Sequence, residues 1–169
     1  MTDERLGDAL WTALDRLPRG GGVIFRHYSL SIGERRALFA QLAKVARRRG
    51  LILVRAGTTP MRGENGVHGR SPKHVRGLCT WPAHNLREVI AGRRAGADVI
   101  PISPVFTTRS HAAQRPLGAV RAARLARAAK GRAVALGGMN HQSFRRLNGA
   151  GFIGWAAIDG WVHDRPTRR

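Results

Sequence analysis

Residues 96–118 read GADVIPISPVFTTRSHAAQRPLG, and the order of residue types in this stretch decides the fold class. Residues 97–106 form a short apolar run that predicts a buried strand, and Leu117 begins a helical pattern that extends to Ala129. A strand followed by a helix is one unit of a parallel α/β fold. The connecting loop is long, and long loops in compact domains are often functional. We therefore expect an active-site loop here, although its composition also fits a solvated surface loop.

The same alternation of short apolar runs and amphipathic stretches continues on both sides of this unit. Expected strands cover residues 21–28, 51–57, 66–68, 75–80, 97–106, 132–139 and 151–161, and expected helices cover 6–17, 33–49, 85–95, 117–129 and 140–147. Seven strands with intervening helices predict a small, trimmed α/β barrel of the (β/α)8 type, with an open doubly wound sheet as the alternative. Residues 58–74 leave no room for a helix, so we expect the helices between the third and fifth barrel strands to be shortened. The domain is expected to cover residues 1–163, followed by a short basic tail over 164–169.

The chain is strongly basic, with 30 lysine and arginine residues against 10 acidic ones and a formal net charge of +20. Such an excess favours nucleic acid as a partner, because clustered basic side chains release its counterions. Only three of the basic residues are lysines, however, and the arginines are spread through every segment. A general arginine bias with a solvated basic surface explains the charge better, so we do not expect a nucleic-acid partner.

Cysteine content and hydropathy indicate the compartment. Cys79 is the only cysteine, which excludes an internal disulfide and a cysteine-rich metal cluster and is typical of a reducing environment. No apolar run approaches the roughly 20 residues that span a bilayer. We expect a cytoplasmic protein without a membrane partner.

Two arginines stand where expected strands end, the edge at which both candidate folds bind ligands. Arg26 and Arg55 follow buried apolar residues, and a buried arginine needs an anionic partner. The partner can belong to the ligand or to the protein, and the sequence leaves both open. His68 either orients a ligand or fills the interior of the barrel, while His84 and His111 are candidate acid–base groups. The sequence contains no HExxH or CxxC motif and no aspartate-rich loop.

A glycine pair follows the next expected strand. Gly137 and Gly138 come directly after the apolar residues AVAL, so their backbone N–H groups can approach an anion, although a tight turn also needs glycine. The preceding loop supplies hydroxyl, guanidinium and imidazole groups that donate hydrogen bonds to phosphate. Together these features predict a phosphate-binding site.

The segments GADVIPISPVFTTRSH and RPLG, followed by AVALGGMN and GAGFIGWAAI, resemble the thiamine phosphate synthase family and its thiazole tautomerase relatives. The resemblance is strongest over residues 96–139 and extends weakly over most of the chain. It implies a (β/α)8 barrel of thiamine biosynthesis that joins a hydroxymethylpyrimidine diphosphate to a thiazole phosphate and releases diphosphate with the help of Mg²⁺. Its partner would be a small phosphorylated heterocycle.

The resemblance assigns roles to residues at the strand ends. Arg26 matches an arginine that grips the diphosphate, and the glycine pair with the loop near Ala156 would hold the thiazole phosphate. The expected catalytic residues are Arg26, Arg55 and His111. The expected substrate- and phosphate-binding residues are Thr80, Ser103, Thr107, Thr108, Ser110, Gly137, Gly138, Ala156 and Ala157.

The sequence departs from the family pattern at the expected metal and diphosphate positions. Arg55 and Ala56 stand where the family has Asn-Asp, and RSPKH at 70–74 replaces a segment that should carry an aspartate. Ile24 and Tyr28 replace a glutamine and a lysine, and His111 replaces the loop lysine. We therefore predict no metal ligands, although the family implies Mg²⁺.

The first strand of the family barrel has no counterpart before the MTDER turn. Either the chain start is placed too late or the barrel lacks this strand, and an unpaired neighbouring strand would favour association into a homo-oligomer. We expect a synthase-type transferase; the alternatives are a thiazole tautomerase-like isomerase, a barrel that binds a phosphorylated ligand without catalysis, and, on charge alone, a nucleic-acid binder.

Overall fold

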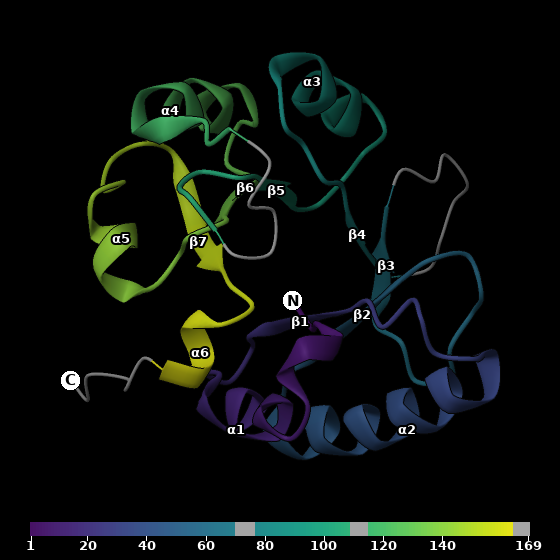
Figure 1. Ribbon diagram of the computed structural model, residues 1–169. Helices are drawn as coiled ribbons and strands as arrows, with labels where there is room; N and C mark the ends of the chain where they lie inside the picture. The colour runs from purple at the N-terminus through teal and green to yellow at the C-terminus, as the bar shows by residue number, and fades with distance from the viewer. Residues whose placement is uncertain (70–76, 109–114, 164–169) are drawn as a thin grey trace.

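The computed structural model describes residues 1–69, 77–108 and 115–163. Its strands are arranged around the centre of the molecule, and its helices cover the outside (Figure 1). The strands are β1 (Gly22–Phe25), β2 (Ile52–Ala56), β3 (Gly66–His68), β4 (Leu78–Thr80), β5 (Ile100–Ile102), β6 (Ala133–Leu136) and β7 (Phe152–Ala156). The helices are η1 (Glu4–Leu6), α1 (Ala9–Arg16), α2 (Ile32–Arg49), α3 (Leu86–Arg94), α4 (Gly118–Ala128), α5 (His141–Arg145) and α6 (Gly160–His163).

All strand pairs are parallel and belong to two sheets. The first sheet has the order β1-β2-β3-β4, and the second has the order β5-β6-β7. Isolated parallel bridges from Thr80 to Val99 and from Ala83 to Ile102 join the two sheets. The strands therefore follow one another in chain order around an incomplete ring, as the sequence predicts for a trimmed barrel.

The ring is incomplete between β7 and β1, where the described residues provide no strand. Two backbone hydrogen bonds bridge this gap at its carboxyl end. The N–H of Thr2 donates to the carbonyl of Ile24 at 2.8 Å, and the amino group of Met1 donates to the carbonyl of Ala157 at 2.8 Å. On the outside, α1 packs against α6, and the Arg16 guanidinium donates to the carbonyl of Val162.

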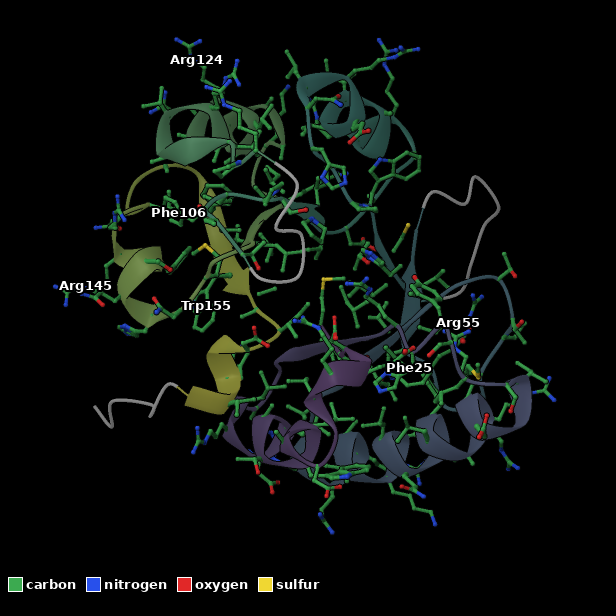
Figure 2. All side chains as sticks on the ribbon, viewed as in Figure 1. Phe25, Arg55, Phe106, Arg124, Arg145 and Trp155 are labelled. Atoms are coloured by element: carbon green, nitrogen blue, oxygen red, sulfur yellow. The ribbon has the colours of Figure 1, made fainter. Side chains whose placement is uncertain are left out.

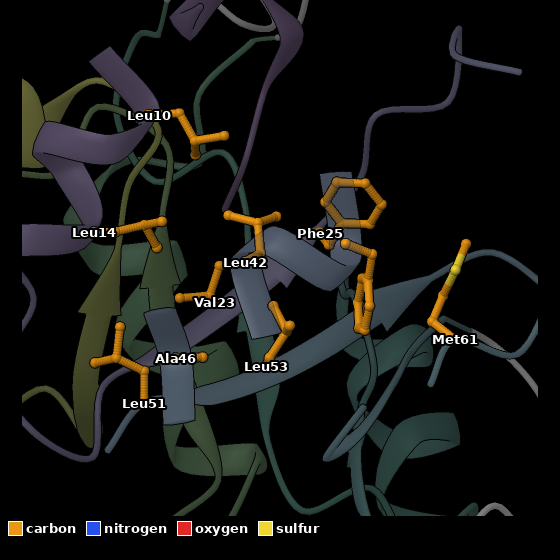
Figure 3. Close-up of a cluster of buried hydrophobic side chains, with 10 residues drawn as sticks. Leu10, Leu14, Val23, Phe25, Leu42, Ala46, Leu51, Leu53 and Met61 are labelled. Carbon is orange, nitrogen blue, oxygen red and sulfur yellow. The ribbon is translucent and has the colours of Figure 1, made fainter. Parts of the chain in front are cut away.

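The packing of α2 on the first sheet forms one of the hydrophobic cores. A capping box begins this helix: Ser31 accepts from the backbone of Glu34, and the Glu34 carboxylate accepts from the backbone of Ser31. Gly50, in the left-handed conformation, ends it. The helix buries its inner face against outward-facing residues of β1 and β2, and Figure 3 shows this cluster. Its members include Leu10, Leu14, Val23, Phe25, Leu42, Leu53 and Met61.

The helices and strands expected from the sequence are present, and several of them are shorter than expected at one or both ends. No helix lies between β2 and β3, and none is found in the described residues between β3 and β4, in agreement with the predicted shortening. The last strand ends at Ala156 rather than at residue 161, because residues 160–163 turn into α6. The predicted tail over 164–169 lies outside the described residues. No helix in the described part of the chain is both long and apolar enough to cross a membrane.

Candidate active site at the carboxyl ends of the strands

The strand register places one row of residues at the carboxyl end of the first sheet, facing the interior of the ring. Ala56 pairs with His68, and His68 pairs with Thr80. Arg26 extends this row, because Phe25 pairs with Arg55 and Arg26 is the next residue. Side chains alternate between the two faces of a strand, and Ile24, Val54 and Ala56 cluster together on the inner face. We call Arg26, Ala56, His68 and Thr80 the inward row.

Arg26 is the charged residue of the inward row. Its backbone N–H donates to Oγ1 of Thr2 at 3.0 Å, and its guanidinium carbon lies 5.9 Å from the centre of the Tyr28 ring. The side chain is partly exposed, and none of the ion pairs observed among the described residues involves it. The guanidinium is therefore placed to meet an anion at the carboxyl end of β1.

His68 and Thr80 form a buried pair beside Arg26. Nδ1 of His68 lies 2.7 Å from Oγ1 of Thr80, and both residues are buried. Burial first, and then the positive charge of Arg26, lowers the pKa of His68 to about 4. His68 is therefore neutral at pH 7. The geometry favours the interpretation that it fills the interior of the barrel.

Arg55 belongs to the opposite face of β2. Its neighbours Phe25 and Leu53 belong to the core beneath α2, and Figure 2 shows the Phe25 and Arg55 side chains in the same region. Nε of Arg55 lies 2.6 Å from Oε2 of Glu64 in a largely buried ion pair. The anionic partner of this arginine is thus a protein carboxylate. The side chain of Arg55 therefore faces α2 rather than the inward row, and its expected catalytic role stays a prediction.

A second buried arginine, Arg35 of α2, was missed by the sequence analysis. Its Nη2 donates to the carbonyl of Ala56 at 2.7 Å and to the carbonyl of Arg26 at 3.1 Å, so it joins the ends of β1 and β2. Its guanidinium also lies over the rings of Phe25, at 5.2 Å, and Tyr28, at 5.4 Å. Arg35 therefore positions the backbone that carries Arg26.

The glycine pair after β6 lies directly against the loop after β5. The N–H of Val105 donates to the carbonyl of Leu136, and the N–H of Phe106 donates to the carbonyl of Gly137. A Cβ at Gly138 would lie 2.5 Å from the carbonyl oxygen of Thr107, and one at Gly137 would lie 2.8 Å from Cα of Pro104. Both glycines also have positive φ values, +93° and +63°. Close packing of the two loops is thus one reason for glycine at these positions.

The other predicted substrate- and phosphate-binding residues lie at several strand ends. Ser103, Thr107 and Thr108 follow β5, and Ala156 and Ala157 stand at the end of β7, which pairs with β6. Thr80 ends β4 in the first sheet, so the second sheet carries the other described residues of this set. Ser110 and His111 lie outside the described residues.

His84 contacts the loop after β5 from the neighbouring strand end. Its Nδ1 lies 2.7 Å from the carbonyl oxygen of Ser103 and 3.4 Å from Oγ of the same serine, and its backbone N–H donates to the Glu88 carboxylate. A carbonyl oxygen only accepts, so Nδ1 carries the proton in the neutral ring and Nε2 keeps its lone pair. Because the side chain is exposed, Nε2 is a candidate proton acceptor.

The inward row does not fit a magnesium ion. Mg²⁺ prefers carboxylate and other oxygen ligands, whereas the row presents a guanidinium, a methyl group, an imidazole and a hydroxyl that is paired with the imidazole. Among the residues that the structure describes, no group of three or more histidine, cysteine, aspartate or glutamate side chains could hold a metal ion. The segment 70–74 lies outside that description.

Comparison with known proteins identifies the family. A family model described as thiamine monophosphate synthase matches residues 72–160, which is more than half of the chain. The chain belongs to this family. It is a transferase family, and the matched residues run from β4 to β7 and include the loops after β5 and β6. No curated protein matches the sequence.

Solved structures confirm the barrel fold. The thiamine phosphate pyrophosphorylase from Pyrococcus furiosus superposes with a TM-score of 0.79 at 20% identity, covering 97% of this chain and 86% of that chain. The thiamine phosphate pyrophosphorylase from Bacteroides thetaiotaomicron gives a TM-score of 0.60 at 18% identity, covering 98% of this chain and 83% of that one. At these identities, the likeness establishes the fold.

Proposed function

We propose that this thiamine monophosphate synthase family member binds a phosphorylated thiazole at the second sheet and joins it to a hydroxymethylpyrimidine diphosphate. The observation that carries the proposal is the family match over residues 72–160, which includes the loops after β5, β6 and β7. The thiazole phosphate is assigned to Gly137, Gly138 and the residues around Ala157, with Thr107 and Thr108 beside it. Thr80 and Ser103 complete this side of the site.

The diphosphate is assigned to Arg26. In the proposed reaction, the bond between the pyrimidine methylene carbon and the diphosphate oxygen breaks, and the oxygen leaves with the electron pair. The thiazole nitrogen then forms the new bond to that carbon. The guanidinium of Arg26 stabilises the negative charge that develops on the departing diphosphate. His111, which lies between β5 and α4 and outside the described residues, is proposed to assist the same step.

Turnover with both substrates tests the proposal. The purified chain is incubated with the pyrimidine diphosphate and the thiazole phosphate, in Mg²⁺ and in EDTA, and thiamine phosphate is measured by mass spectrometry. We expect product in both conditions and at least a tenfold lower rate for Arg26→Gln. Arg124→Gln, at an exposed position of α4 (Figure 2), is the matched control and should leave the rate unchanged. No product at high enzyme concentration would refute the synthase assignment.

A proton-transfer reaction on a thiazole phosphate is the second candidate, because of the geometry of His84. Its Nδ1 is fixed by the carbonyl of Ser103, which leaves Nε2 able to remove a proton from a bound ligand. In this reaction, Nε2 takes a proton from one ligand carbon and returns it to another, without a diphosphate substrate. His84→Ala should abolish isomerisation of a thiazole phosphate carboxylate, whereas His141→Ala, exposed on α5, should not. An unchanged rate for His84→Ala would exclude this role.

A further inference from the structure

A buried positive charge lies at the carboxyl ends of β1 and β2, beside the inward row. Arg35 of α2 is only 8% exposed, and its Nη2 donates to the carbonyls of Arg26 and Ala56. None of the ion pairs observed among the described residues includes Arg35. Burying a charge without a counter-charge is costly. This guanidinium is therefore a cation that lacks an anionic partner within the described part of the chain.

The carboxylates on the neighbouring segments are engaged elsewhere. Glu34, the residue before Arg35, accepts from the backbone N–H and the hydroxyl of Ser31 at 2.9 and 2.6 Å. Glu4 accepts from the backbone N–H and the hydroxyl of Ser29. Serine groups rather than the guanidinium hold both carboxylates, so the positive charge of Arg35 remains available to a ligand.

One edge of the Arg35 guanidinium is free to donate. Its Nε is fully buried without an acceptor. Its Nη1 has no acceptor among the described residues either, but it is not one of the fully buried unpaired nitrogens, so it is the part that a ligand can reach. A Cβ added at the partly exposed Gly57 would lie 3.3 Å from Nη1 and 3.8 Å from Cε1 of Tyr28. The absence of a side chain at Gly57 therefore leaves space for a ligand atom beside Nη1.

Arg26 and Tyr28 border the same space. The strand register places Arg26 beside Ala56, and its guanidinium carbon lies 5.9 Å from the centre of the Tyr28 ring. The guanidinium carbon of Arg35 lies 5.4 Å from the same ring centre, and Tyr28 is 57% exposed. One exposed ring thus holds two guanidinium groups close together at the ends of the strands. Two such groups favour a diphosphate over a single phosphate, because each can bind one phosphoryl group.

We propose that Arg26, Tyr28, Arg35 and Gly57 form a diphosphate site that needs no metal ion, with Arg35 as its second binding residue. Nη1 of Arg35 donates to one phosphoryl group, and the Arg26 guanidinium donates to the other. The inward row has no carboxylate to hold a magnesium ion, and the Arg35 guanidinium supplies the second positive charge in its place. The choice of a diphosphate as the ligand rests on the proposed function, whereas the pair of arginines is a property of the structure.

Inorganic diphosphate is the probe for the test. The full chain is titrated with it in EDTA, and the Kd is measured by isothermal titration calorimetry. We expect binding without metal, and roughly tenfold weaker binding of inorganic phosphate, which cannot reach both guanidinium groups. Arg35→Gln should weaken diphosphate binding by roughly tenfold or more, because charge-assisted hydrogen bonds are lost. Arg36→Gln makes the same change at the exposed neighbour on α2 and should leave the Kd unchanged.

A second variant keeps both arginines and so separates ligand binding from support of the backbone. Gly57→Ala places a methyl group beside Nη1 of Arg35 and should weaken diphosphate binding by roughly tenfold. Gly63→Ala is the matched control on the same loop, because Gly63 has a similar φ, +87° against +95°, and an added Cβ meets only the Ala43 side chain, at 3.5 Å. Both variants should lose stability in thermal denaturation through the strained φ, but only Gly57→Ala should lose affinity.

The outcomes separate this site from the proposed reaction, because thiamine phosphate formation is measured on the same preparations. The absence of diphosphate binding in EDTA would overturn the role of Arg35, whatever the turnover. An unchanged Kd for Arg35→Gln, or equal Kd values for Gly57→Ala and Gly63→Ala, would also overturn it. Diphosphate binding with the expected losses but without turnover would support the site and refute the proposed reaction.

Discussion

Arg55 of β2 and Glu64 of the loop after it form an ion pair in which Nε lies 2.6 Å from Oε2, and the side chains are only 8% and 18% exposed. The same carboxylate oxygen accepts the backbone N–H of Met61 at 2.9 Å. Glu64 therefore ties the β2–β3 loop to the strand and neutralises the arginine.

The first prediction concerns this ion pair. Glu64→Gln keeps an oxygen that can accept from Met61 but leaves the charge of Arg55 unpaired. We expect the free energy of unfolding, measured by urea denaturation, to fall by about 3 kcal/mol. Asp15→Asn removes the charge from the exposed pair with Arg49 and should cost less than about 1 kcal/mol. Equal effects at the two sites would contradict the buried role of Arg55.

The second prediction concerns the pH dependence of stability. Burial first, and then the charge of Arg26, lowers the pKa of His68 to about 4, whereas an unfolded histidine titrates near 6.5. The unfolded state therefore binds more protons between these values, so stability falls as the pH is lowered from 6.5 to 4. At about 1.4 kcal/mol per unit, the full loss is about 3 kcal/mol. His68→Gln should flatten the stability–pH profile in this window, and an unchanged profile would contradict the burial of His68 as a neutral side chain.

The third prediction tests the contact between the two phosphate-side loops. Gly138→Ala directs a methyl group at the carbonyl of Thr107 and strains a residue with φ of +63°. We expect a loss of about 2 to 3 kcal/mol in the free energy of unfolding. Gly154→Ala on β7, where an added Cβ meets no atom within 4 Å, should change stability by less than about 1 kcal/mol. A neutral Gly138→Ala variant would show that the loops do not pack as described.

The fourth prediction concerns Gly92 of α3, where the higher helix propensity of alanine competes with the close packing of Trp81. An alanine at Gly92 would gain about 1 kcal/mol in helix propensity. Its Cβ, however, would lie 2.7 Å from Cδ1 of Trp81, which packs against α3. We expect Gly92→Ala to be net destabilising in thermal denaturation. Gly33→Ala, in α2, meets no atom within 4 Å and should stabilise by up to about 1 kcal/mol.

The alternation of apolar runs and amphipathic stretches predicted the fold, because in a parallel barrel each strand and helix is a local segment. It could not predict α6, because the apolar residues after Ala156 fit a strand as well as a helix. Composition likewise could not show that Trp155 and Trp161 stack across a turn.

The sequence predicted which residues stand at the ends of strands, and these residues make up the candidate site. It did not predict to which face of the strand each side chain points. Arg26 and Arg55 both end apolar runs, yet the strand register turns one inward and the other toward α2. Glu64 was not recognised as the partner, because it lies on a loop nine residues further on. Arg35 could have been found from its spacing, because it shares a helix face with Phe39, Leu42 and Ala46.

The gap between β7 and β1 also fixes an order of events during synthesis on the ribosome. The strands of the first sheet pair with one another once residue 80 has been made, and β4 gains its bridges to the second sheet only later. The contacts that cover the gap join α1 to α6, the first α-helix and the last. The nascent chain must therefore carry α1 without α6 while the whole second sheet is translated, so these contacts cannot form until translation of the domain is nearly finished.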